Sequence, residues 1–142
     1  MNIVLPHHIL HAINCLNNAG YEAFAVGGCI RDSLIGRTPT DWDITTSAHP
    51  HQILEVFREF PCLDYGISHG TITVIMQDSH IEITTYRVDG AYSDGRHPDR
   101  VTFTGVLTED LKRRDFTINA MAYNDRSGIV DAFDGMQDLE NG

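Results

Sequence analysis

The chain has 142 residues, 42% of them apolar and 21% charged, which is ordinary for a single globular domain long enough to bury a core. Its net charge of −10 argues against a surface that grips nucleic acid by itself, because such surfaces are normally basic. No apolar run approaches the ~20 residues of a membrane span, and the N-terminus lacks a basic-then-apolar signal sequence, so we expect a cytoplasmic location. The three cysteines are widely spaced without a Cys-x-x-Cys pair, which favours packing roles.

The first predicted element is a helix that begins at Pro6, where apolar residues start to recur at helical spacing, and ends before Gly20. His7, His8 and His11 lie on this helix. We interpret them as a solvated face rather than a zinc site, because the sequence offers no carboxylate partner nearby. The remaining expected scaffold consists of strands over residues 21–26, 41–45 and 129–133, a helix from about 50 to 60, a hairpin over 72–83, and a helix opening at 135.

A glycine pair, Gly27-Gly28, follows the first strand and precedes a short helix over residues 29–35. Because glycine has no side chain, its backbone can approach a phosphate closely, and the amides at a helix N-terminus favour an anion. Arg31, in the first turns of this helix, is positioned to add charge-assisted contacts to the same phosphates. The alternative for Arg31 is a surface ion pair with Asp32.

Two aspartates, Asp41 and Asp43, lie one residue apart on the next expected strand. Side chains alternate along a strand, so both carboxylates point the same way while Trp42 packs inward. Paired carboxylates beside a glycine turn suggest a two-metal phosphoryl-transfer site. Glu82, in the hairpin, would be a third acid of this site if its strand lies next to the aspartates; otherwise it is an exposed strand glutamate.

In the second half, Thr108 and the acids after it predict a helix start, and residues 116–123 are expected to continue as helix. Asp115 and Asn119 are then four apart and share a face that can meet a ribose, with Arg114 beside them. The alternative is a buried Arg–Asp pair that holds the helix to the sheet.

The polar, turn-rich segment 90–98 predicts a mobile loop over or beside the site. Within it, Arg96 and His97 could touch substrate phosphates or could be ordinary loop residues.

Two stretches carry a family resemblance: residues 27–43, and the later Arg113-Arg-Asp-Phe-Thr-Ile-Asn-Ala120. Together they resemble the signatures of the bacterial tRNA CCA-adding enzyme and poly(A) polymerase group of the DNA polymerase beta superfamily. Residues 82–87 and 96–99 are also similar to that group. The resemblance runs from about Phe24 to Leu139, nearly the whole chain.

This resemblance implies an α/β (α+β) fold with a small mixed β-sheet and flanking helices. It implies that residues 1–142 are a catalytic head, with the neck, body and tail regions that hold tRNA absent from this chain. The implied activity adds C and A nucleotides from CTP and ATP to the 3′ end of tRNA, with two Mg²⁺ ions. The implied site residues are Asp41 and Asp43 for catalysis; Asp41, Asp43 and Glu82 for metal; and Gly27, Gly28, Arg31, Arg114, Asp115 and Asn119 for the nucleotide.

Other functions stay open from the sequence. The same head occurs in poly(A) polymerases and in CC-adding and A-adding variants, because the base-selecting motif of the group lies beyond Gly142. A non-enzyme alternative is a nucleotide- and metal-binding module without transfer activity. We expect the 142-residue piece alone to bind nucleotides weakly and to add little or nothing to tRNA.

Overall fold

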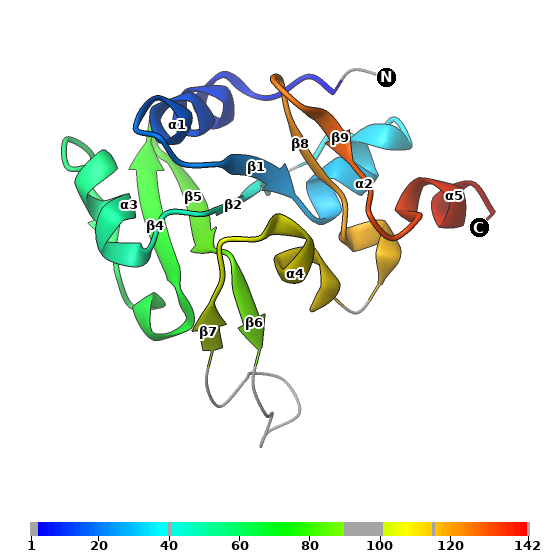
Figure 1. Ribbon diagram of the computed structural model, residues 1–142. Coiled ribbons are helices and arrows are strands. Elements are labelled where there is room, and N and C mark those ends of the chain that lie inside the picture. Colours follow the sequence, from blue (N-terminus) through cyan, green and yellow to red (C-terminus); the bar gives the residue numbers. More distant parts are fainter. Residues whose placement is uncertain (1–2, 40, 90–100, 115, 142) are drawn as a thin grey trace.

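The structure, a computed structural model, describes residues 3–39, 41–89, 101–114 and 116–141 (Figure 1). The helices are α1 (His7–Asn18), α2 (Gly28–Leu34), α3 (Pro50–Val56), α4 (Leu107–Lys112) and α5 (Gly135–Asn141), with short 3-10 helices η1 (Ile67–His69) and η2 (Thr117–Asn119). The strands are β1 (Ala23–Val26), β2 (Asp43–Thr46), β3 (Cys62–Leu63), β4 (Thr71–Met76), β5 (Ser79–Thr85), β6 (Arg87–Asp89), β7 (Val101–Phe103), β8 (Ala122–Asn124) and β9 (Gly128–Val130).

A seven-stranded mixed sheet, in the order β3-β4-β5-β2-β1-β8-β9, forms the centre of the molecule, and β6 and β7 form a separate ribbon (Figure 1). Among the described strands, β2 and β5 pair in parallel, while the other paired strands run antiparallel. Parallel neighbours need a long crossover connection. Here α3, β3 and β4 provide it, which leaves β2 in the middle of the sheet.

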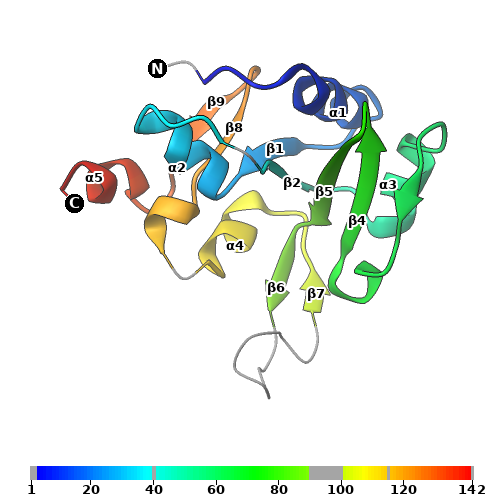
Figure 2. The ribbon, with the colours of Figure 1, turned by 180° about the vertical axis from the view of Figure 1, so that it is seen from behind.

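The main hydrophobic core lies between the sheet and helices α1 and α3. Leu16 of α1 and Ile53 of α3 are fully buried, as is Ile83 of β5. Burying a side chain of this size contributes about 1.5–3 kcal/mol. Helices α2 and α5 lie near the β8–β9 end of the sheet, away from α3, which both views show (Figures 1 and 2). This core fixes the strands whose other face carries the polar residues described below.

A smaller core covers part of the opposite face. Phe24 and Val26 of β1 pack there against Leu111 of α4. Their register partners on β2 are Thr45 and Asp43, so these side chains share the same face. Helix α4 therefore covers the β1 side of this face, and Asp43 stays exposed beside it.

Several predicted elements are confirmed. Helix α1 begins directly after Pro6, and the helix predicted over 29–35 is α2, which begins one residue earlier, at Gly28. The predicted hairpin is the β4–β5 pair, whose turn residues Gln77 and Asp78 both have positive φ. The second strand begins at Asp43, so Asp41 precedes it. The described cysteines Cys15, Cys29 and Cys62 are free thiols, buried or half-buried.

The predicted helix over residues 116–123 is wrong. The chain forms the 3-10 turn η2 and then strand β8, in which Ala122 and Tyr123 pair with β1. Sheet pairing and burial at the edge of β1 outweigh the local helical pattern. The predicted helix cap is also wrong, because the N-cap of α4 is Val106 and not Thr108. The backbone N–H of Val106 donates a hydrogen bond to Thr104 Oγ1 at 3.3 Å.

The β6–β7 ribbon was not predicted, and the expected loop over 90–98, with Arg96 and His97, lies outside the described residues. In the part of the chain that the structure describes, no helix has the length and apolar character needed to cross a bilayer.

Candidate nucleotide and metal site

Three acidic side chains gather at the start of β2. Asp43 is the register partner of Glu82 on the parallel strand β5, and Asp41 lies two residues before it. Trp42 between them is only 8% exposed, whereas Asp41, Asp43 and Glu82 are exposed. The expected alternation is therefore present, and the strand of Glu82 does lie beside the aspartates.

The neighbours of Asp43 change its acidity. Partial burial of the carboxyl group raises its pKa, and the charge of Glu82 raises it further. Arg114 lowers the pKa of the same group, and Asp41 raises it again. Because the residue as a whole stays exposed, the desolvation is partial and the neighbouring charges matter. The acidic cluster thus carries surplus negative charge that a cation would balance.

A cation fits this donor set by its chemistry. Carboxylate oxygens are the hard ligands that Mg²⁺ prefers, and Mg²⁺ usually takes one or two carboxylates and completes its shell with water and substrate phosphates. Within residues 3–39, 41–89, 101–114 and 116–141, no three His, Cys, Asp or Glu side chains already converge on one metal position. The carboxylates of Asp41 and Asp43 are of the ligand type that such a cation takes, and Glu82 lies in register with Asp43.

The glycine pair makes a tight turn between β1 and α2. Gly27 has φ 89° and ψ −143°, a backbone conformation that is almost exclusive to glycine. At Gly28, a Cβ atom would come within 3.2 Å of Nη2 of Arg31. The absence of both side chains leaves room for a guanidinium group against the turn.

Arg31 makes two polar contacts. Its Nη1 donates a hydrogen bond to Asn119 Oδ1 at 3.0 Å, and its Nε donates to Asp32 Oδ1 at 3.1 Å. Its side chain is 32% exposed, so it can still reach a ligand in solution. The surface ion pair considered from the sequence is present. Asn119 also reaches the side chain of Arg31, although it lies in η2 and the helix predicted to carry it does not form.

Arg114, two residues after the end of α4, approaches the same turn. Its Nη1 would lie 3.7 Å from a Cβ on Gly27, and its Nη2 lies 3.7 Å from Asp110 Oδ2. Burial lowers the pKa of Arg114, Arg113 lowers it further, and Asp110 and Asp43 act in the opposite direction. Asp115 lies outside the described residues, so its expected partnership with Asn119 has no structural description.

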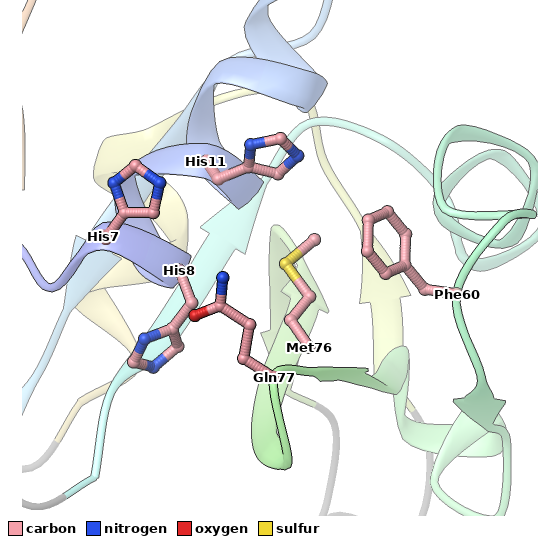
Figure 3. Close-up of a pocket in the computed structure, with 6 residues that line it drawn as sticks. All are labelled: His7, His8, His11, Phe60, Met76 and Gln77. Atoms are coloured by element: carbon pink, nitrogen blue, oxygen red, sulfur yellow. The ribbon is translucent and has the colours of Figure 1, made fainter.

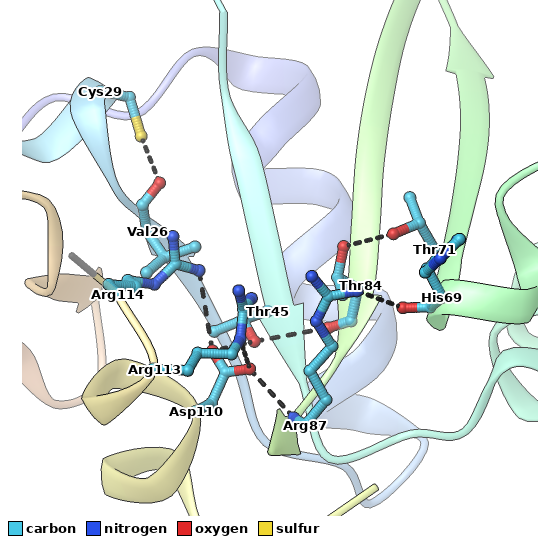
Figure 4. A network of polar contacts seen from close by, with 10 residues as sticks. All are labelled: Val26, Cys29, Thr45, His69, Thr71, Thr84, Arg87, Asp110, Arg113 and Arg114. Carbon is cyan, nitrogen blue, oxygen red and sulfur yellow. Dashed lines mark hydrogen bonds and ion pairs between the residues drawn. The ribbon is translucent and has the colours of Figure 1, made fainter. Parts of the chain in front are cut away.

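Sequence reasoning missed Asp110. This aspartate is fully buried and accepts hydrogen bonds from the Thr45 hydroxyl and the Arg87 backbone amide, both at 3.0 Å (Figure 4). Arg113 Nε also donates to it at 3.3 Å. The available signal was spacing, because acids three and four residues before arginines share a helix face with them.

The described residues also contain a pocket of about 190 Å³ between α1 and the β4–β5 turn (Figure 3). It is lined by His7, His8, His11, Phe60, Met76 and Gln77, and His11 contacts Phe60 edge-on at 6.2 Å between ring centroids. The pocket includes none of the predicted site residues, so it is separate from the acidic cluster.

Residues 23–142 match the family model of the poly A polymerase head domain, and the chain belongs to this family.

Among curated relatives, the CCA-adding enzyme of Lactobacillus delbrueckii subsp. bulgaricus is 53% identical over 125 residues, covering 88% of this chain and 31% of that protein. The CCA-adding enzyme of Enterococcus faecalis is 49% identical over 126 residues, with 89% of this chain and 30% of that protein covered. The chain thus spans about a third of the length of these relatives.

The chain is also similar to solved structures of this kind of enzyme. The Bacillus stearothermophilus CCA-adding enzyme in complex with CTP superimposes with a TM-score of 0.81 at 41% identity, covering 93% of this chain and 31% of that one. A tRNA nucleotidyltransferase complexed with a primer tRNA and an incoming ATP analogue gives a TM-score of 0.66 at 29% identity, over 91% of this chain and 36% of that one.

Proposed function

We propose that this chain is the catalytic head of a template-independent RNA nucleotidyltransferase that adds C and A nucleotides from CTP and ATP to the 3′ end of tRNA. The observation that carries the proposal is the register of Asp43 and Glu82 on adjacent parallel strands, with Asp41 alongside and the Gly27-Gly28 turn at the end of β1. The relatives named as CCA-adding enzymes support the choice of tRNA over a poly(A) product.

The proposed metal ligands are Asp41, Asp43 and Glu82, which would hold two Mg²⁺ ions. When bound, such a pair activates the attacking 3′-hydroxyl and stabilises charge on the phosphate and the leaving pyrophosphate. Burial raises the pKa of Asp43, and the charges of Glu82 and Asp41 raise it further; this repulsion supports the role, because a cation would remove it.

The proposed nucleotide contacts come from the other side of the site. The Gly27-Gly28 turn would let a triphosphate lie against backbone amides, and Arg31 would add charge-assisted hydrogen bonds to it. Arg114 and Asn119 would hold the sugar end, since both lie at the same turn. Asp115 is included in this group on sequence grounds alone.

The acidic character of the chain bears on the tRNA partner. With a net charge of −10, these residues offer little attraction for an RNA backbone. We therefore propose that tRNA is held mainly by regions beyond this domain and that the isolated domain transfers nucleotides poorly. As tRNA processing by its bacterial relatives suggests, we also propose that the protein works in the cytoplasm.

Calorimetric titration tests the proposal directly. CTP and ATP are titrated into the 142-residue chain with and without Mg²⁺, in the wild type and in the Asp41→Ala/Asp43→Ala variant. We expect binding that needs both the metal and the aspartates. Binding that is indifferent to Mg²⁺ and to both substitutions would contradict the proposed metal site.

A further inference from the structure

Asp110 lies beneath the candidate site as a shared acceptor. It is the fully buried acid of α4, and its two carboxylate oxygens face different partners. Oδ1 accepts from the Arg87 backbone amide at 3.0 Å and from Arg113 Nε at 3.3 Å. Oδ2 accepts from Thr45 Oγ1 at 3.0 Å and lies 3.7 Å from Arg114 Nη2. One carboxylate thereby joins β2, β6 and the end of α4 (Figure 4).

This carboxylate meets β2 close to the acidic cluster. Thr45 is two residues after Asp43, on the same face of the strand, so the Asp110–Thr45 bond lies one side-chain position from the proposed metal ligand. Arg114 spans the remaining distance, with one guanidinium nitrogen beside Asp110 and another beside Gly27. Asp110 therefore lies behind Arg114 as seen from the glycine turn.

The Arg114 side chain is largely buried, and its guanidinium pairs with Asp110. The side chain is 20% exposed, and its buried Nε has no hydrogen-bond partner among the described residues. A flexible guanidinium that must meet a ligand at one place needs something to fix its direction. Among the described acidic residues, Asp110 is the one whose carboxylate pairs with Arg114.

From this arrangement we infer that Asp110 is a positioning residue that holds Arg114 toward the Gly27-Gly28 turn for the incoming nucleotide. The inference deepens the proposed function and rests on it for the identity of the ligand. Asp110 itself, being fully buried, does not touch the nucleotide. Asp110 keeps one guanidinium nitrogen of Arg114 at the turn, and its negative charge balances the positive charges of the arginines around it.

The first test measures positioning without any ligand. In the 142-residue chain, the Nε–H signal of Arg114 is followed by ¹⁵N NMR in the wild type and in Asp110→Asn. We expect a single sharp signal in the wild type, because the contact between Asp110 and Nη2 fixes the orientation of the guanidinium, and a broadened or averaged signal in the variant. An Arg114 signal that Asp110→Asn leaves unchanged would overturn the inference.

A second variant covers the case in which Asp110→Asn does not fold. Thr45→Val removes the hydroxyl that donates to Asp110 Oδ2, with little change in shape and with the charge intact. We expect it to broaden the Arg114 signal in the same direction but less. The matched control is Glu22→Gln, which neutralises another carboxylate that accepts a hydrogen bond, in this case from the Tyr86 hydroxyl at 3.0 Å. This variant should leave the Arg114 signal unchanged.

The second test is a double-mutant cycle on nucleotide affinity. We expect Asp110→Asn to weaken CTP binding by about tenfold, the size of one charge-assisted hydrogen bond, and to add almost nothing once Arg114→Ala is present. A merely structural aspartate would add its effect in both backgrounds, which would overturn the inference. If the wild type binds no nucleotide at all, the proposed function fails, while the NMR result still decides the positioning.

Discussion

Asp43 and Glu82 are register partners on two parallel strands, and both side chains lie on the exposed face of the sheet. Like charges placed side by side on neighbouring strands repel each other and cost stability. Natural proteins keep such arrangements where function needs them. Substitutions at Asp43 and Glu82 therefore test both the proposed metal site and the loss of folding stability that their repulsion causes.

Glu82 is the acid whose role the sequence left open. We expect Glu82→Gln to weaken Mg²⁺-dependent CTP binding by about 10–100-fold, because lost metal partners commonly cost that much. Calorimetry in the presence of Mg²⁺ measures the change. Glu55→Gln, an exposed acid on α3, is the matched control. Equal affinities for wild type and Glu82→Gln would make Glu82 an ordinary surface residue of β5.

The raised pKa of Asp43 predicts an unusual pH dependence. A carboxyl whose pKa is higher in the folded state than in the unfolded chain binds its proton more tightly when folded, so its contribution to stability falls as pH rises between those two values. Above that window the charged group opposes folding. We therefore expect Asp43→Asn to raise the melting temperature at pH 7 by about 1–3 °C, since exposed charges contribute little.

The melting curves should converge as pH is lowered through the titration of Asp43. Calorimetric melting of both proteins from pH 7 to pH 4, without metal, checks this. A variant less stable than the wild type at pH 7 would show that Asp43 is held by favourable contacts instead of opposed by its acidic neighbours.

The role of the Gly27-Gly28 turn in nucleotide binding can be separated from the backbone strain that any substitution at a glycine with positive φ causes. Gly27→Ala and Gly20→Ala both place a side chain where φ is positive, at +89° and +97°. Each should cost about 1–3 kcal/mol of folding free energy, measured by urea denaturation. Only Gly27→Ala should also weaken CTP binding, because Gly20 has no atom within 4 Å of the added Cβ and belongs to no part of the site. Equal loss of affinity in the two variants would remove the turn from the nucleotide site.

Arg31 has two partners that predict different outcomes. If it binds phosphate, Arg31→Gln should reduce ATP and CTP affinity by about tenfold. Asp32→Asn should leave the affinity equal or higher, because it frees the guanidinium from its ion pair at 3.1 Å. Titration of both variants against the wild type distinguishes the roles. An affinity lowered as much by Asp32→Asn as by Arg31→Gln would mean that the ion pair matters in itself.

Much of the site could be predicted from local patterns. The alternation around Trp42 and the hairpin that carries Glu82 follow from side-chain periodicity, and the structure confirms both. The sequence could not decide whether Glu82 lies beside Asp43. This depends on which strand lies next to β2, and that is decided by a crossover whose contacts are distant in sequence.

The failures lie where tertiary contacts override local preference. Residues 122 and 123 look helical in isolation, yet they complete the edge of β1 as β8. Asp110 reads as a solvent-exposed acid in the first turn of a helix, a favourable place for its charge. Its burial arises because α4 lies across β1 and beside β2, so that Thr45 and the Arg87 amide reach its carboxylate.

The parallel pairing of β2 with β5 has a consequence for how the molecule assembles. Between these strands the chain must complete α3, β3, η1 and β4, so the contact between Asp43 and Glu82 is a non-local one that forms slowly compared with helices and hairpins. A nascent chain that ends before β5 contains Asp41 and Asp43 but lacks Glu82, so it has no Asp43–Glu82 pair, whatever secondary structure it has gained. Full affinity for a divalent cation should therefore appear only when β5 has paired with β2, which would make metal binding a reporter of completed folding.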